Sequence, residues 1–147
     1  MTARFHNPVD TRFGWGSLQE LANITEHQNV ALVTFPEARG LGLVDRLHAL
    51  LGERLVYVIE DVQPNPDVAQ LRATYERFWQ EAGDCHAVIA VGGGSAIDTA
   101  KALIVGTESG RFDELLALLA SGKPFVPARS KQLIAAPTTA GTGSEVT

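Results

Sequence analysis

The sequence has a single cysteine and no run of basic residues, and each scarcity excludes a class of protein. Cys85 alone cannot form an internal disulfide framework. Its position just before an apolar run predicts a small buried side chain rather than a reactive thiol. The 12 lysines and arginines are scattered in a chain of net charge −5. A nucleic-acid-binding surface needs them clustered, so we expect no nucleic-acid partner.

Long hydrophobic stretches are also missing. No segment reaches the roughly 20 apolar residues of a membrane-spanning helix, and the first residues lack the apolar stretch of a signal peptide. We therefore expect a cytoplasmic protein without a membrane partner. The histidines lie apart from one another, at His6, His27, His48 and His86. None has a second histidine or a carboxylate at metal-ligand spacing, so we expect no metal site made by this chain alone.

What the sequence does contain is a regular alternation of strand and helix patterns. With 147 residues and 45% apolar content, the chain can form one domain that buries roughly two-thirds of its unfolded surface. Continuous apolar runs predict strands at 30–33, 54–60, 87–91 and 132–136. Three- and four-residue spacings predict helices at 17–27, 43–51, 68–82, 96–105 and 112–119. This order predicts an α/β fold with a mainly parallel sheet and helices on both faces.

The N-terminal residues 4–13 alternate loosely between apolar and polar side chains. Pro8 cannot donate a backbone hydrogen bond inside a sheet, so we expect an N-terminal edge strand or a short hairpin here.

The sequence around Gly92, Gly93 and Gly94 changes from an apolar strand to a helix through a glycine turn. Consecutive glycines bury nothing and cost chain entropy, so their use is to let backbone N–H groups approach a ligand closely. A helix N-terminus offers unpaired N–H donors and a partial positive charge. The turn therefore predicts a site for an anion such as a phosphate.

A second turn, at residues 138–144, is rich in threonine and glycine and also follows a predicted strand. Ligands of parallel sheets bind beyond the carboxyl ends of the strands, where both turns are expected. Together they could hold a dinucleotide, with N–H groups on the pyrophosphate and threonine hydroxyls on the ribose or nicotinamide. The usual dinucleotide fingerprint is incomplete, because Ile97 stands where its third glycine belongs.

Ser95 and Asp98 also have the spacing of a capping box, in which both side chains bond helix N–H groups. Capping and ligand binding are compatible at one helix end. Lys101 lies three residues after Asp98, which suits either a surface ion pair or a phosphate contact. Ser144 lacks the second glycine of a nucleophile elbow and no histidine follows it, so we expect no catalytic residue in this chain.

The segments 92–101 and 137–147, taken together and in this order, resemble the paired signatures of the iron-containing (group III) alcohol dehydrogenases. The resemblance covers nearly the whole chain, including Pro64-Asn65-Pro66. It implies a Rossmann-like, doubly wound N-terminal domain that binds NAD or NADP, with hydride passing between the nicotinamide and a small alcohol or aldehyde. The cofactor-binding residues that it implies are Gly92, Gly93, Gly94, Ser95, Asp98, Thr138, Thr139 and Thr142.

In this family an aspartate and three histidines hold Fe²⁺ or sometimes Zn²⁺, mostly from a helical C-terminal domain. The resemblance thus implies that residues 1–147 are the dinucleotide-binding domain, without the metal-binding domain and inactive alone. The missing domain would leave an apolar face exposed, which predicts self-association or a homo-oligomer. The alternatives are a stand-alone nucleotide-binding or regulatory module, or a relative of dehydroquinate synthase and glycerol dehydrogenase.

Two departures concern cofactor and substrate. Phe35 stands where NAD-preferring members often carry an aspartate for the adenosine ribose, which leaves NADP open. The start of the chain, Phe5 to Val9 and Phe13 to Gly16, is similar to aldehyde reductases of phosphonate metabolism, which suggests a phosphonoacetaldehyde-type substrate.

Overall fold

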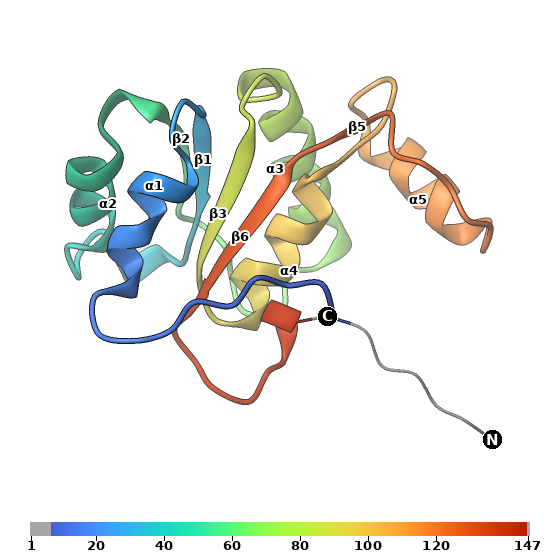
Figure 1. The fold of residues 1–147 in the computed structure, drawn as a ribbon. Helices are drawn as coiled ribbons and strands as arrows, with labels where there is room; N and C mark the ends of the chain where they lie inside the picture. Colours follow the sequence, from blue (N-terminus) through green and yellow to red (C-terminus); the bar gives the residue numbers. More distant parts are fainter. Residues whose placement is uncertain (1–6, 147) are drawn as a thin grey trace.

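A four-stranded parallel sheet forms the centre of the computed structural model, which describes residues 7–146 (Figure 1). Its strands are β1 (Val30–Val33), β2 (Leu55–Ile59), β3 (Ala87–Gly92) and β6 (Gln132–Pro137). They lie in the order β2-β1-β3-β6, and every neighbouring pair is parallel. The predicted fold class is confirmed.

Helices cover both faces of this sheet (Figure 1). The helices α1 (Leu21–Ile24) and α2 (Leu43–Leu51) lie on one face, and α3 (Val68–Glu81), α4 (Gly94–Leu103) and α5 (Phe112–Ala120) lie on the other. Short 3₁₀ turns are η1 (Ser17–Glu20), η2 (Pro36–Ala38), η3 (Gly52–Arg54) and η4 (Ser144–Val146). Among the described residues, no helix is long and apolar enough to cross a membrane.

The central strand β1 explains why the sheet strands are apolar without alternation. Val30 and Leu32 pack in the cluster with α1 and α2, whereas Ala31 and Val33 pack in the cluster with α3 and α4. Successive side chains of a strand point to opposite faces, and both faces are covered here. All four side chains are therefore buried.

The prediction of an N-terminal edge strand or short hairpin is wrong for residues 7–13, which form no strand; residues 4–6 lie outside the described part of the chain. The Asn7 side-chain oxygen accepts the Val9 N–H at 3.1 Å, which turns the backbone locally. Pro8 between them has no N–H to give to a ladder. This segment instead passes close to η4, where the Asn7 amide donates to the Val146 carbonyl at 3.5 Å.

The predicted helix 17–27 is shorter than expected and divides into η1 and α1. The Arg54 guanidinium donates to the carbonyls of Ala22 (3.1 Å) and Thr25 (2.8 Å). A longer helix would use the Ala22 carbonyl for its own next turn. A contact from a distant segment therefore accompanies the end of this helix.

Two short strands, β4 (Val105–Gly106) and β5 (Arg129–Ser130), form an antiparallel ribbon that the sequence pattern did not predict. The predicted helix 96–105 ends at Leu103 instead. The Val105 carbonyl accepts the hydroxyl of buried Tyr75 at 2.7 Å, so this backbone is committed to a contact with α3.

Candidate functional site

The carboxyl ends of β1 and β3 lie side by side, and between these two strands the order in which the chain adds strands to the sheet reverses. From β1 the chain crosses to β2 on one side, and β3 then returns to the other side of β1. Such a switch point is where open α/β sheets bind ligands. Buried Thr34 holds the two ends together, because its hydroxyl donates to the Val91 carbonyl at 2.7 Å.

The glycine turn joins β3 to α4 at this edge. Gly93 is the N-cap residue and α4 begins at Gly94. A Cβ atom at Gly92 would lie 2.8 Å from the Ala96 Cβ and 3.4 Å from a ring carbon of Phe35. Gly92 is thus required for the first turn of α4 to pack this closely against the strand.

The hydroxyl-rich turn lies directly against the glycine turn. The Thr138 N–H donates to the Gly92 carbonyl at 2.9 Å. A Cβ at Gly93 would lie 3.3 Å from the Thr139 hydroxyl oxygen, and one at Gly94 would lie 3.5 Å from the Thr142 Cβ. The two segments that the sequence placed at one edge are therefore in contact. The three threonines, Thr138, Thr139 and Thr142, are exposed.

Ser95 and Asp98 do not form the capping box that their spacing would allow, because Gly93 occupies the N-cap position and no side chain caps α4. The Ser95 hydroxyl oxygen accepts the Asn65 N–H at 3.0 Å. Asp98 accepts a hydrogen bond from the Ser144 hydroxyl and pairs with Lys101, both at 3.4 Å. The ion pair was one of the two predicted roles of Lys101. The first N–H groups of α4 are left without a side-chain cap, which suits an anionic ligand.

Asn65 also belongs to this edge, although the sequence predicts no functional role for it. It adopts a left-handed conformation with φ of 50°, which asparagine tolerates better than most residues. The flanking prolines, Pro64 and Pro66, were the signal, since Pro-Asn-Pro excludes a helix or strand and favours a sharp turn. Its N–H reaches over the glycine turn to Ser95.

The described residues provide neither a metal-binding site nor a thiol nucleophile. Within 7–146 no three histidine, cysteine, aspartate or glutamate side chains gather at a possible metal site. The described residues therefore do not by themselves fit the iron of the family that the sequence resembles. Cys85 is buried as predicted, and burial raises the pKa of its thiol. A thiol kept protonated is a poor nucleophile.

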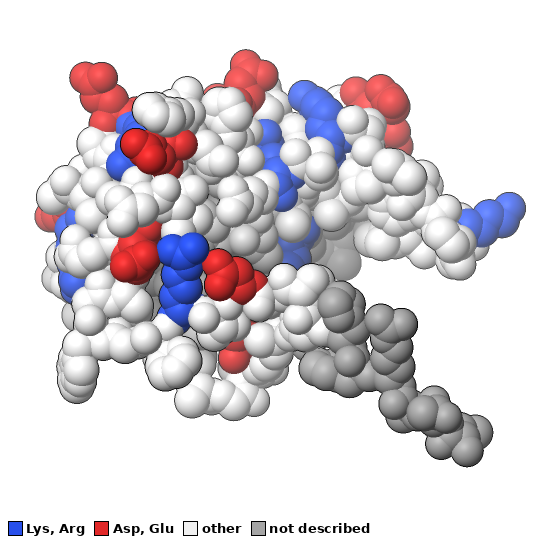
Figure 2. Space-filling view, in the orientation of Figure 1, with Lys and Arg blue, Asp and Glu red and all other residues white. Residues whose placement is uncertain are grey.

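Several charged side chains of the described residues form ion pairs on the surface. On the face in Figure 2, acidic and basic side chains lie next to one another at several places among uncharged residues. Arg12 contacts Glu20 at 3.0 Å and Asp10 at 3.2 Å, and Arg39 contacts Glu60 at 3.0 Å. Exposed pairs of this kind add little stability.

The strand order, the two helical layers and the pair of turns at one edge define a Rossmann-like α/β domain. The family model described as iron-containing alcohol dehydrogenase matches residues 8–147. The chain belongs to the iron-containing alcohol dehydrogenase family.

Individual relatives agree with this assignment. The chain is 36% identical to alcohol dehydrogenase 4 of Schizosaccharomyces pombe, over 97% of this chain and 34% of that protein. It is 34% identical to the NADPH-dependent butanol dehydrogenase of Clostridium saccharobutylicum, over 98% and 37%. The crystal structure of sulfoacetaldehyde reductase from Bifidobacterium kashiwanohense in complex with NAD⁺ superposes with a TM-score of 0.82 at 34% identity, covering 100% of this chain and 39% of that one. The chain thus spans little more than a third of the length of these relatives.

Proposed function

We propose that residues 1–147 form the NAD(P)-binding domain of a metal-dependent alcohol dehydrogenase or aldehyde reductase. The observation that carries this proposal is the contact between the hydroxyl-rich turn and the glycine turn at the uncapped N-terminus of α4. Relatives whose names include NADPH and NAD⁺ support it. A cofactor bound at this edge supplies hydride transfer, and the protein supplies binding and orientation.

Each part of the edge has a role in this proposal. The backbone N–H groups at Gly93, Gly94 and Ser95 hold the pyrophosphate, where the positive end of α4 favours negative charge. The hydroxyls of Thr138, Thr139 and Thr142 can both donate and accept, which suits the ribose and the nicotinamide amide.

Gly92 and Asp98 support the edge rather than meeting the phosphate directly. Gly92 lets α4 approach the strand, and Asp98 holds Ser144 of the hydroxyl-rich turn. We propose that the metal of the family, as Fe²⁺ or Zn²⁺, and the residues that position the alcohol or aldehyde come from outside residues 1–147. The isolated chain is then inactive, and its substrate, including a phosphonoacetaldehyde-type aldehyde, stays a prediction. The cytoplasmic location expected from the sequence also stays a prediction.

Titration with NADH and NADPH tests the proposal. We expect both to bind, with dissociation constants within about tenfold of each other, a difference of at most about 1.4 kcal/mol. Phe35 neither bonds the adenosine ribose through a carboxylate nor repels a 2′-phosphate. Arg39, in the same loop, is held by Glu60 at 3.0 Å, so a 2′-phosphate has to compete for it.

Nicotinamide fluorescence and calorimetry both measure these constants. If neither NADH nor NADPH bound at millimolar concentration, the proposed function of this edge would be wrong. A preference for NADH well beyond tenfold would show that another group discriminates against the 2′-phosphate.

We further propose that the chain self-associates through the face that carries this edge. Phe13 and Trp15 are 92% and 107% exposed, and both belong to the N-terminal segment that runs past η4 towards α1. Two such aromatic side chains in water favour association. Analytical ultracentrifugation at rising concentration is expected to show dimers or larger species, and fewer of them in Phe13→Ser/Trp15→Ser. A clean monomer at high concentration would contradict the proposal.

A further inference from the structure

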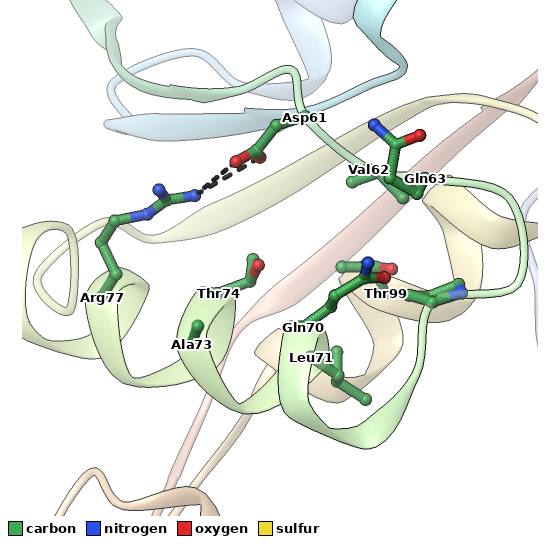
Figure 3. A pocket seen from close by; sticks show the side chains of 10 residues that line it. Asp61, Val62, Gln63, Gln70, Leu71, Ala73, Thr74, Arg77 and Thr99 are labelled. Carbon is green, nitrogen blue, oxygen red and sulfur yellow. Dashed lines mark hydrogen bonds and ion pairs between the residues drawn. The ribbon is translucent and has the colours of Figure 1, made fainter.

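A cavity of about 360 Å³ lies between α3 and the loop that follows β2 (Figure 3). The loop contributes Asp61, Val62 and Gln63 to its lining. Thr99 of α4 also lines it. None of the residues assigned to the dinucleotide lines this cavity, and its volume falls within the range of small-molecule sites.

Thr99 is the feature that points to a ligand. The residue is 97% buried, and within the described residues its hydroxyl has no hydrogen-bond partner. A threonine inside a helix can donate to the carbonyl four residues earlier, but no such bond satisfies the Thr99 hydroxyl. Burying a hydroxyl without any partner is unfavourable, and native proteins seldom do so. The hydroxyl oxygen has almost no solvent-accessible surface, so a molecule in the cavity would become its missing partner once the side chains beside it shift.

The charges of the cavity restrict what that molecule is. Asp61 and Arg77 pair with each other at 3.2 Å along one side, so neither offers an uncompensated charge to an ion (Figure 3). Gln63, Gln70 and Thr74 add neutral polar groups. Because the Gln70 side-chain oxygen accepts the Asp67 N–H at 3.4 Å, its amide N–H groups remain available as donors.

The remaining wall is apolar. Val62, Leu71 and Pro66 line it beside the polar groups. A site with an apolar wall, two hydroxyls and two amides fits a neutral ligand that has both an apolar face and hydrogen-bonding groups. Charged ligands would have to break the Asp61–Arg77 pair to find a counter-charge.

We propose that this cavity is a second binding site, for an uncharged hydroxyl-bearing molecule of about nucleoside or monosaccharide size, with the Thr99 hydroxyl as its inner hydrogen-bonding group. The cavity lies on the α3 side of α4, and the proposed dinucleotide edge lies at the N-terminus of α4. The two sites share no residue, although Thr99 lies one turn after Ser95 on α4 and Pro66 follows Asn65, so binding here is tested independently of the dinucleotide.

NMR titration of the ¹⁵N-labelled chain tests the proposal with three probes: uridine, glucose and uridine monophosphate. We expect uridine or glucose to shift the amide signals of residues 62, 71, 74 and 99 with a millimolar dissociation constant. The two uncharged probes distinguish a nucleoside site from a sugar site. Thr99→Val keeps the shape of the side chain and is expected to weaken this binding about tenfold, the loss of roughly one hydrogen bond.

The same variant separates a ligand-binding hydroxyl from a structural one. Replacing an unpartnered buried hydroxyl by a methyl is expected to raise the melting temperature of the ligand-free chain by about 3 °C. Thr25→Val is the matched control, because the buried Thr25 hydroxyl donates to the Leu21 carbonyl at 2.7 Å. It is expected to lower the melting temperature and leave probe binding unchanged.

Three outcomes would overturn the proposal. The first is that neither uridine nor glucose, at about 20 mM, shifts the amide signals of the cavity residues. A specific weak site has a dissociation constant below about this concentration. The second is unchanged binding of the uncharged probes in Thr99→Val. The third is tighter binding of uridine monophosphate than of uridine at these residues, since the cavity would then select an anion.

Discussion

Replacing Gly93 by valine is expected to weaken NADH binding at least about 100-fold, equivalent to about 2.7 kcal/mol, while the fold is kept. Gly93 has φ of −79° and ψ of −171°, which any residue adopts without strain. The added Cβ would lie 3.3 Å from the Thr139 hydroxyl oxygen, and the valine methyls would extend from it between the two turns. They would cover the N–H groups that are proposed to hold the pyrophosphate.

Fluorescence titration gives the affinity of this variant, and circular dichroism on heating gives its stability. Ser130→Val is the control, because Ser130 is exposed in β5 and lies near the amino end of β6, away from the edge. It adds the same branched side chain and is expected to leave the affinity unchanged. If Gly93→Val bound NADH as the original chain does, the glycine turn would have a structural role only.

The contact between the two turns was predictable from residue patterns because it depends on a general property of parallel sheets. A strand that is buried on both faces is recognisable in the sequence as a continuous apolar run, as at 30–33 and 87–91. Parallel strands end at the same edge, so the segments that follow them meet there. In the structure β3 and β6 are neighbours, and the Thr138 N–H reaches the Gly92 carbonyl at 2.9 Å.

The details that were missed depend on contacts between distant residues. Ser95 and Asp98 have the spacing of a capping box, but the helix begins one residue before Ser95, and their partners are Asn65 and Ser144. Nothing in the local sequence around Ser95 indicates a residue 30 positions earlier. Spacing rules describe a helix in isolation, whereas these side chains respond to loops that pack on it.

The ribbon of β4 and β5 was missed for a different reason. Each strand has two residues, which is too short for any periodicity to be visible. The pairing depends on the absence of a side chain at Gly106, where the Trp79 ring lies. In the sequence, a lone glycine such as Gly106 indicates only the end of a helix. That the Trp79 ring packs on Gly106 is visible only in the fold.

Gly106→Val is expected to be the most destabilising of the substitutions considered, by about 3 kcal/mol, as for severe overpacking of a core. A Cβ there would lie 2.6 Å and 2.7 Å from two carbons of the Trp79 ring and 2.9 Å from the Arg129 Cβ. The ring cannot move aside easily, because two cationic groups lie over it. The Arg129 guanidinium carbon is 4.5 Å from the ring centroid and the Lys131 Nζ is 4.7 Å from it. The melting temperature is expected to fall by about 6–12 °C.

A double-mutant cycle shows whether this collision is the cause. Trp79→Phe removes the outer ring carbons that the new side chain meets, and it destabilises the chain by itself because Trp79 is nearly buried. If the collision is the cause, adding Gly106→Val to Trp79→Phe costs less than adding it to the original chain, by at least about 1 kcal/mol. Strict additivity of the two losses in urea unfolding would contradict this explanation.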